Sequence, residues 1–331
     1  MSDNRAPDHP LVSVVFSFRN ERQNIPILIG RLEAMFARVG VDYELLFVND
    51  ASNDGSLEAL VDARRQNPRV KVVNMSRRFG VSECARAGMA AASGDATIIM
   101  DADLQDPPEV IPQLIEKWRA GADVVHTVRT RRRGESAVKM MLTRLAYRII
   151  HMGSSIELPV DAGDFKLLSR AALNHLLALQ ESDPYLRGLV VWIGFQQAFV
   201  PYEREARHAG TTHFPFFSRN PWKTFAIGLT SFSFMPIFTV IGAAATAAIV
   251  TGVLVLVTLL LLVARGTVST TLTLVTIGAV FWTTILAAIA AVGIYVIRIY
   301  KDVRNRPQYI VESTIGLSQA AEEAPAERAL P

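Results

Sequence analysis

The sequence has very little cysteine and almost no excess of one charge. Its 331 residues include a single cysteine, Cys84, and the formal net charge at pH 7 is +3. One cysteine excludes an internal disulfide framework and is typical of a reducing compartment, so we expect Cys84 to be a packing residue in a helix. So small a charge gives no reason to expect a nucleic-acid partner, and the sequence contains no zinc-finger or RNA-recognition motif.

Two phosphate-binding signatures and an apolar N-terminal segment are also missing. No G-x-G-x-x-G follows an expected strand and no G-x-x-x-x-G-K-[ST] occurs, so motifs give no support for a dinucleotide fold or a P-loop. Residues 1–10 are polar, and we expect them to form a tail without a cleavable signal peptide.

Long apolar runs, by contrast, are present toward the C-terminal end. Half of the residues are hydrophobic, and residues 236–264 and 270–297 are almost uninterrupted apolar segments. Each exceeds the roughly 20 residues that a helix needs to cross the hydrocarbon core of a bilayer. A buried helix of a water-soluble protein is rarely so long and uncharged, so we predict two transmembrane helices within residues 236–298.

The residues that flank these segments predict the topology. Arg219 and Lys223 precede the pair, and a basic group follows it: Arg298, Lys301, Arg304 and Arg306. Because basic residues gather on the cytosolic side of a membrane, we expect both termini in the cytosol. Residues 214–235, rich in aromatic residues, predict an interfacial amphipathic helix. Residues 299–331 predict a cytosolic tail that is partly disordered.

Residues 11–213 contain strand patterns that alternate with helix patterns. Apolar, β-branched segments predict strands at 11–18, 43–48, 70–73, 96–100 and 123–128. The segments between them carry apolar residues at helical spacing, with polar residues such as Asn53 or Asp54 as expected N-caps. This alternation predicts an α/β domain with a mainly parallel sheet flanked by helices.

The fourth expected strand ends in acidic residues. Asp101, Asp103 and Gln105 would share one face if the extended chain continued, because side chains alternate along a strand. Two carboxylates and an amide oxygen suit Mg²⁺, which prefers oxygen ligands and shares them with water and substrate phosphates. The alternative is a solvated loop with an Asx-type turn before Pro107.

The string Met-Asp-Ala-Asp-Leu-Gln-Asp-Pro-Pro-Glu at residues 100–109 resembles the signature of family 2 glycosyltransferases. It is most similar to those that transfer a sugar from a nucleotide to a polyprenyl phosphate, such as dolichol-phosphate mannose synthase and the bacterial undecaprenyl-phosphate glucosyl and aminoarabinosyl transferases. The resemblance runs from about residue 11 to 309. It implies a GT-A-like fold, inverting transfer, and Mg²⁺ or Mn²⁺ held by Asp101, Asp103 and Gln105, with Asp103 also part of the catalytic set.

The resemblance also implies a nucleotide site at the end of the first strand. The family usually has Pro-x-Tyr-Asn-Glu there, and this chain has Ser17-Phe-Arg19-Asn-Glu21, in which the last two residues match. We expect nucleotide contacts from Ser17, Arg19, Glu21, Asp50 and Asp101. Asp50 can accept a hydrogen bond from an N–H on a base edge, although it and Asp54 can also simply cap a helix. The departure at Arg19 leaves UDP, common in bacterial relatives, and GDP both open.

Basic residues after the fifth strand are candidates for phosphate binding. Guanidinium groups match phosphate oxygens in a bidentate way, which favours Arg129 and Arg132, while a solvated loop or contact with anionic lipid headgroups is the alternative. Resemblance places Arg207, Thr212 and His213 in the family's Arg-x-x-Gly-x-Ser-Lys-Tyr motif, where Thr replaces Ser and His replaces Lys.

A second acidic motif, residues 161–170, implies that Asp164 is the catalytic base. The chemistry gives this base little to do, because a phosphate monoester has a second pKa near 6 and its oxygen is already largely anionic at neutral pH. Asp164 would then orient the acceptor or support the metal. A plain turn residue after Gly163 is the remaining alternative.

We therefore predict a multi-pass enzyme of the bacterial inner membrane. It would transfer a sugar, most simply from a UDP-sugar, to undecaprenyl phosphate, making a lipid-linked sugar for modification of cell-envelope glycans, and the resemblance implies a homotetramer. The sequence lacks the Q-x-x-R-W string of processive polysaccharide synthases, which argues against a polymerase. Two alternatives stay open: a glycosyltransferase acting on another membrane lipid such as a diacylglycerol, and a catalytically silent membrane-anchored partner subunit.

Overall fold

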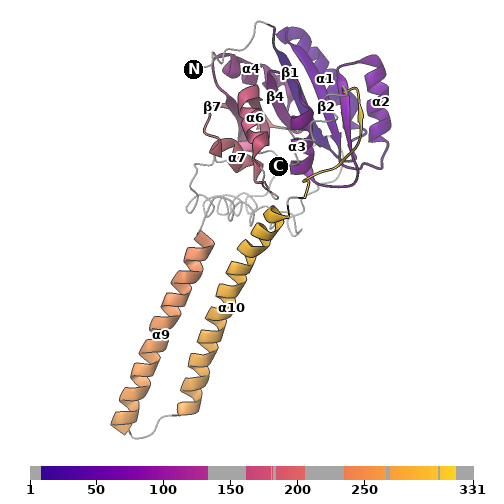
Figure 1. The fold of residues 1–331 in the computed structure, drawn as a ribbon. Helices are drawn as coiled ribbons and strands as arrows, with labels where there is room; N and C mark the ends of the chain where they lie inside the picture. The colour runs from indigo at the N-terminus through magenta and orange to yellow at the C-terminus, as the bar shows by residue number, and fades with distance from the viewer. Residues whose placement is uncertain are drawn as a thin grey trace.

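The computed structural model describes residues 9–132, 162–179, 181, 184–205, 235–265, 269–304 and 306–317. Within these residues the chain forms an α/β domain and a pair of long helices that extends away from it (Figure 1). The predicted interfacial helix at 214–235 lies almost entirely outside the described residues, as do the polar residues 1–8 and the last residues of the tail.

Eight described strands form one sheet in the order β7-β5-β6-β4-β1-β2-β3-β8. The strands are β1 (Leu11–Phe18), β2 (Asp42–Asn49), β3 (Val70–Met75), β4 (Ala96–Asp101), β5 (Val124–Arg132), β6 (Ala162–Ser169), β7 (Gln197–Arg204) and β8 (Val311–Ile315). All of them run in the same direction except β6 and β8, which are antiparallel to their neighbours. The predicted α/β class with a mainly parallel sheet is confirmed.

Helices cover both faces of this sheet. They are α1 (Asn24–Val39), α2 (Ser56–Gln66), α3 (Val81–Ala91), η1 (Pro108–Val110), α4 (Ile111–Arg119), α6 (Arg170–Ala178) and α7 (Leu186–Trp192). The predicted cap of α2 is displaced: Gly55 is the N-cap, and Asp54 instead accepts hydrogen bonds from the backbone N–H and hydroxyl of Ser56.

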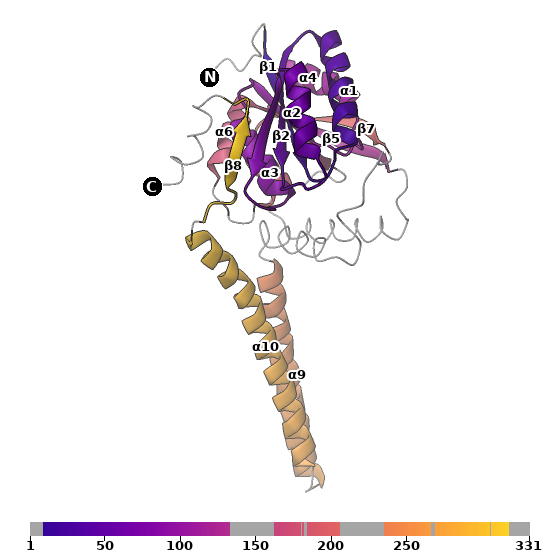
Figure 2. The same cartoon turned by 90° about the vertical axis from the view of Figure 1, so that its right-hand side faces the viewer.

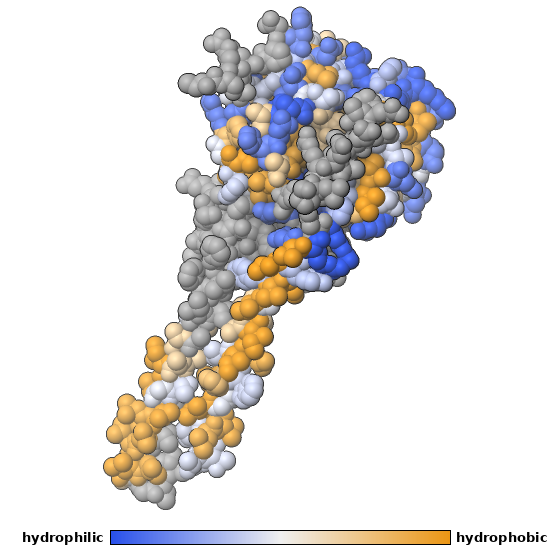
Figure 3. Space-filling view, viewed as in Figure 1, coloured by the Kyte–Doolittle hydropathy of each residue, from blue (hydrophilic) through white to orange (hydrophobic). Residues whose placement is uncertain are grey.

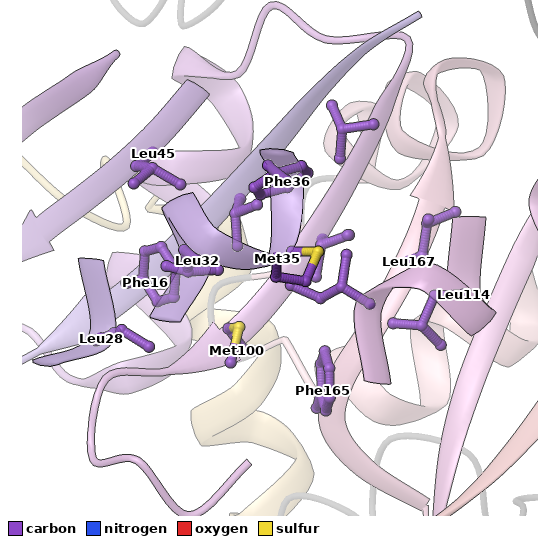
Figure 4. Packing of buried hydrophobic residues seen from close by; sticks show 14 of the residues in the cluster. Phe16, Leu28, Leu32, Met35, Phe36, Leu45, Met100, Leu114, Phe165 and Leu167 are labelled. Carbon is purple, nitrogen blue, oxygen red and sulfur yellow. The ribbon is translucent and has the colours of Figure 1, made fainter. Parts of the chain in front are cut away.

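The larger apolar core lies between the sheet and α1 with α4 (Figure 4). Leu28, Leu32 and Met35 project from one face of α1, as their helical spacing predicts, and pack over Phe16, which stacks on Phe47 with 4.6 Å between ring centroids. Burial of each such side chain stabilises the fold by about 1.5–3 kcal/mol.

The opposite face of the sheet is covered by α3 and α6. The small residues of α3 let it approach closely: a Cβ on Gly88 would collide with the side chains of Val15 and Val48. Cys84 is fully buried here and has no disulfide partner, which confirms its predicted role as a packing residue.

Strand β8 follows the long helices and was not expected from the sequence. It pairs antiparallel with β3, with Met75 opposite Val311 and Val72 opposite Ile315. The carboxyl end of β3 therefore lies beside the start of β8, close to where the chain leaves the last helix (Figure 2). Since β1, β2 and β4 run parallel to β3, their carboxyl ends form the sheet edge that faces the helix pair.

The helix pair consists of α9 (Met235–Arg265) and α10 (Thr270–Val303), which lie side by side (Figures 1 and 2). Residues 245–264 and 273–303 are long and apolar enough to cross a membrane, and none of their most apolar stretch is buried. Figure 3 shows hydrophobic residues along the outside of both helices. The two apolar helices form a candidate transmembrane hairpin, in which α10 continues six residues past the predicted end at 297.

Candidate active site

Several of the predicted site residues gather at the sheet edge that faces the helix pair. Ser17 and Asp101 are paired across β1 and β4 near the ends of these strands, and Asp50 follows β2. Because β6 runs in the opposite direction, it begins at this edge, and Asp164 lies near its start. Strands β5 and β7 run in the same direction as β4, so their later residues, Arg129 and Arg204, lie toward the same edge.

Three aspartates, at the end of β4 and in the loop that follows it, form the acidic part of this site. Asp103 and Asp106 are 5% and 1% exposed, and Asp101 at the strand end keeps 32% of its side chain exposed. Burial of the Asp101 carboxyl, together with the negative charges of Asp103, Asp106 and Asp164, raises its pKa to about 7, although Arg204 opposes this shift. A divalent cation bound among these carboxylates would compensate both the burial and the mutual repulsion.

The expected alternation of Asp101, Asp103 and Gln105 along an extended chain is wrong. Strand β4 ends at Asp101, and Leu104 has φ of +59°, in the left-handed region that interrupts an extended conformation. Asp103 accepts a hydrogen bond from the backbone N–H of Gln105 at 3.1 Å, which is an Asx-type turn. The turn keeps Asp103 near Asp101 by folding the chain back rather than by extending it.

These residues fit a divalent cation as a partial ligand set. Among the residues that the structure describes, no three acidic, His or Cys side chains converge as a complete metal cage. Two carboxylates with remaining positions for water and substrate oxygens are the usual arrangement for Mg²⁺. Asp101 and Asp103 would hold the ion, and the assignment of Gln105 stays a prediction.

Asp164 is bound by an arginine to which the sequence analysis assigned no role. Arg187, at the start of α7, donates two hydrogen bonds to the Asp164 carboxylate, at 2.8 and 2.7 Å. Burial opposes ionisation of Asp164, but Arg187, Lys166 and Arg129 outweigh it and hold the pKa of Asp164 well below its usual range. This carboxylate is ionised at neutral pH and is a weak base.

Cations surround Asp164 and outnumber it. Lys166 is 1% exposed, and burial lowers its pKa to about 8 although Asp164 opposes the shift. The guanidinium of Arg129 lies directly against Gly163, where a Cβ would be 2.8 Å from Nη2. With Arg187 included, this part of the site has a surplus of positive charge, next to the acidic part on β4.

A buried cluster joins the acidic and basic parts. Asp106 Oδ1 accepts a hydrogen bond from the hydroxyl of Tyr202 at 2.5 Å and lies 3.3 Å from Nε of Arg204. The Tyr202 hydroxyl in turn accepts from Nε of Arg129 at 3.2 Å. The sequence analysis assigned no role to Asp106, Tyr202 or Arg204, although Asp106 stands within the acidic string that it singled out.

The predicted nucleotide residues are held by a tight polar turn. Asp50 Oδ1 accepts from the backbone N–H groups of Phe79 and Gly80, at 2.6 and 3.3 Å. Glu21 is buried and accepts from the Asn24 side chain at 2.5 Å. Nη1 of Arg19 is buried and has no hydrogen-bond partner within the described part of the chain, so it is a donor available to a ligand.

Four predicted residues cannot be located. Arg207, Thr212 and His213 lie outside the described residues, as does the side chain of Arg132. The structure thus brings together Ser17, Asp50, Asp101, Asp103 and Asp164 with Arg129, and their binding and catalytic roles stay predictions.

Comparison with known proteins gives the class. Residues 13–177 match the family described as glycosyl transferase family 2. A bactoprenol glucosyl transferase derived from prophage SfII in Shigella flexneri is 33% identical over 312 residues, covering 92% of this chain and 98% of the relative. The chain belongs to glycosyl transferase family 2 and is a glycosyltransferase.

One further relative and one solved structure show how far the similarity extends along the chain. The uncharacterized glycosyltransferase YkcC of Bacillus subtilis is 38% identical over 314 residues, covering 93% of this chain and 95% of the relative. Glucosyl-3-phosphoglycerate synthase from Mycobacterium tuberculosis, solved with Mn²⁺, UDP and phosphoglyceric acid, is 20% identical, covers 61% of this chain and 72% of its own, and has a TM-score of 0.45. A likeness that weak carries no information about the site.

Proposed function

We propose that this protein transfers a sugar from a UDP-sugar to a membrane polyprenyl phosphate, with Mg²⁺ or Mn²⁺ bound at Asp101 and Asp103. The observation that carries the proposal is the charge pattern at the sheet edge facing the apolar helix pair. Carboxylates stand at the end of β4, and a surplus of cations surrounds Asp164 beside them. A metal–diphosphate fits the acidic part, and an anionic acceptor fits the basic part.

The relatives support the acceptor class. A bactoprenol glucosyl transferase aligned over nearly its full length acts on a lipid of this kind, and a polyprenyl phosphate requires an enzyme that stands at a bilayer. Helices α9 and α10 would hold the sheet edge at the membrane surface, with residues 11–213 and both termini in the cytosol. The donor then reaches the site from water and the acceptor reaches it from the lipid.

The reaction follows from the charges. The bond between the anomeric carbon and the diphosphate oxygen breaks while an oxygen of the lipid phosphate bonds to that carbon, with inversion. When bound, the metal supplies electrostatic stabilisation of the diphosphate leaving group. Asp164 orients Arg187, Arg187 and Arg129 bind the acceptor phosphate, and the buried Lys166 adds positive charge nearby.

Asp164 need not remove a proton in this scheme. Its pKa is held low, and a phosphate monoester is already largely ionised near neutral pH. We infer that Asp164 is a positioning residue rather than a base. Arg19, whose buried Nη1 has no hydrogen-bond partner among the residues that the structure describes, would bind the nucleotide.

The test is product identification with the purified full chain in detergent or nanodiscs. Labelled UDP-sugars are incubated with undecaprenyl phosphate, and in a parallel reaction with diacylglycerol, and the lipid product is identified by mass spectrometry. We expect sugar on the polyprenyl phosphate only. Sugar on diacylglycerol would favour the first alternative. Absence of both transfer and UDP–Mn²⁺ binding in calorimetry would favour the silent partner.

Metal-ligand variants complete that test. Asp103→Asn should lower transfer at least 100-fold, because each oxyanion-stabilising group contributes roughly 10²–10³ in rate. Asp123→Asn is the matched control. Asp123 is also a buried aspartate, but it precedes β5 at the end of the sheet away from the site, where it accepts a hydrogen bond from the Ser169 hydroxyl. Transfer at the wild-type rate by Asp103→Asn would show that the metal assignment is wrong.

A further inference from the structure

Asp106 is the most buried carboxylate of the site, and the proposed chemistry leaves it without a role. It is 1% exposed, whereas Asp101 and Asp164 each keep about a third of their side chains exposed, at 32% and 36%. A buried carboxylate is retained at low cost only where hydrogen bonds and opposite charges compensate its lost hydration. The partners of Asp106 therefore indicate what it does.

Its partners are groups that reach the site from β7 and β5. One oxygen, Oδ1, meets the Tyr202 hydroxyl at 2.5 Å and Arg204 Nε at 3.3 Å. Tyr202 uses the same hydroxyl to accept from Arg129 at 3.2 Å. One carboxylate thus pairs with one guanidinium by charge, without a hydrogen bond to its Nε within the described part of the chain, and reaches a second one through a phenol.

The position of Arg204 shows why the contact matters. Its Nη2 lies 3.9 Å from Oδ2 of Asp101, a proposed metal ligand, while its Nε lies 3.3 Å from Asp106. An arginine beside a metal site competes with the cation for its carboxylates. Because Arg204 lies closer to Asp106 than to Asp101, its charge is compensated mainly by Asp106. Its guanidinium still lies at the edge where phosphate would bind.

The loop that carries Asp106 is itself attached to β7. The backbone N–H of Glu205 donates to the Gln105 carbonyl at 2.9 Å, and Arg31 pairs with both Glu205 and Glu109. The acidic loop and the end of β7 therefore keep a fixed separation, as a contact that positions a second side chain requires.

We propose that Asp106 is a positioning residue that holds Arg204 directly, and Arg129 through Tyr202, in the orientation in which they bind substrate phosphates. The inference rests on the proposed function. Asp106 itself touches neither substrate nor metal, and it acts through the two arginines.

The test uses four variants of the full chain. Asp106→Asn keeps the shape of the side chain and removes its charge, and Tyr202→Phe removes the hydroxyl that joins Asp106 to Arg129, with both of its hydrogen bonds. Their controls are Asp123→Asn, a buried aspartate at the far end of β5, and Tyr43→Phe, a tyrosine that stacks on Phe36. Thermal unfolding establishes that each variant is folded.

We expect Asp106→Asn to lower kcat/KM by roughly 10- to 100-fold, because it removes the charge that both arginines depend on, and Tyr202→Phe by roughly 3- to 10-fold, because it leaves the ion pair of Asp106 with Arg204 in place. Both losses should appear mainly in KM, and the controls should stay near wild type. Unchanged KM in both variants would overturn the proposal.

Double-mutant cycles separate positioning from general stabilisation. In an Arg129→Gln background Tyr202→Phe should cost less than in wild type, because only its hydrogen bond to Asp106 is still there to lose. In an Arg204→Gln background Asp106→Asn should likewise cost less than in wild type. If the fold-losses of Asp106→Asn and Arg204→Gln multiplied in full in the double variant, the role of Asp106 would be overturned. An inactive wild type with every nucleotide sugar would instead count against the proposed function.

Discussion

Nε and Nη2 of Arg187 donate to the two oxygens of Asp164, with Nε–Oδ1 at 2.8 Å and Nη2–Oδ2 at 2.7 Å. This bidentate geometry is the strongest form of carboxylate–guanidinium contact. It keeps Asp164 ionised and it orients Arg187, whose flexible side chain would otherwise adopt many rotamers. The pair is therefore one unit in which each residue determines the position of the other.

The first prediction concerns this unit. Asp164→Asn and Arg187→Gln should each lower kcat/KM about 10- to 100-fold. The double variant should be little worse than either, because each single change already disrupts the same ion pair. Steady-state transfer assays measure the losses. If the fold-losses of the two single variants multiplied in the double variant, Asp164 and Arg187 would not act as one unit.

The second prediction concerns pH. Because the pKa of Asp164 is held well below its usual range, its ionisation does not change between pH 5 and 8. Asp164→Asn should therefore keep every limb of the wild-type pH–rate profile in that interval. A limb that belongs to a neighbour such as Lys166, whose pKa the Asp164 charge raises, should only move to lower pH. A limb of the wild-type profile that disappears in Asp164→Asn would show instead that Asp164 acts as a base.

The third prediction uses His126, a buried histidine of β5 that stacks on Phe199. Burial, with the charge of Lys166, lowers its pKa from 6.5 to about 4, although Gln197 opposes the shift. Between these values the unfolded chain binds more protons than the folded one, so stability falls as the pH drops from 6.5 to 4. The loss amounts to about 3 kcal/mol.

His126→Gln removes this titration, and its unfolding free energy should depend less on pH in that interval. Denaturant unfolding of the α/β domain within the full chain, followed by tryptophan fluorescence, measures the difference. His175→Gln, at an exposed position of α6, is the control. The same pH slope in His126→Gln as in wild type would contradict the assignment.

The fourth prediction concerns Glu44, which binds four groups at the sheet edge remote from the site. It accepts from the Ser13 hydroxyl, Lys71 and the backbone and hydroxyl of Ser93. Glu44→Ala should lower stability by about 3–5 kcal/mol, the usual cost of removing one partner of a buried ion pair. Asp62→Ala, which removes an exposed ion pair with Arg65, should cost under about 1 kcal/mol.

The fifth prediction follows a chain of polar contacts from β8 to the nucleotide turn. Asn74 donates to Glu312 of β8 at 3.1 Å and accepts from Asn49 at 2.7 Å, and Asn49 accepts from the backbone N–H of Ser52 at 3.0 Å. Asn74→Ala breaks this chain and should weaken UDP–Mn²⁺ binding roughly 3- to 10-fold by calorimetry. Asn67→Ala, which breaks a similar Asn–Glu bond to Glu33, should leave that affinity unchanged.

Local sequence patterns were sufficient for most of the fold. The helical spacing of Leu28, Leu32 and Met35 correctly predicted the buried face of α1, because burial of apolar side chains decides the orientation of a helix. Continuous apolar runs likewise predicted the buried strands. Both signals are contained within a dozen residues.

Features that depend on distant partners were not predicted. Strand β8 is short and partly exposed, and it is a strand only because β3 offers an unpaired edge. The contact of Asp106 with Tyr202 joins residues 96 positions apart. Leu104 has a left-handed backbone conformation, which decides how Asp103 approaches Asp101. Sequence patterns predict such a conformation at glycine but not at leucine.

Strand β8 has a mechanical consequence. The chain leaves α10 and within a few residues is hydrogen-bonded into the sheet, with the backbone N–H of Ser76 donating to Ile310 at 3.1 Å. Tilting of α10, which helices use to match bilayers of different thickness, would therefore rotate the sheet with it. Under the proposed function, the composition of the surrounding lipid would then set the height of the site above the headgroups, and so the rate at which a lipid acceptor meets the sugar donor.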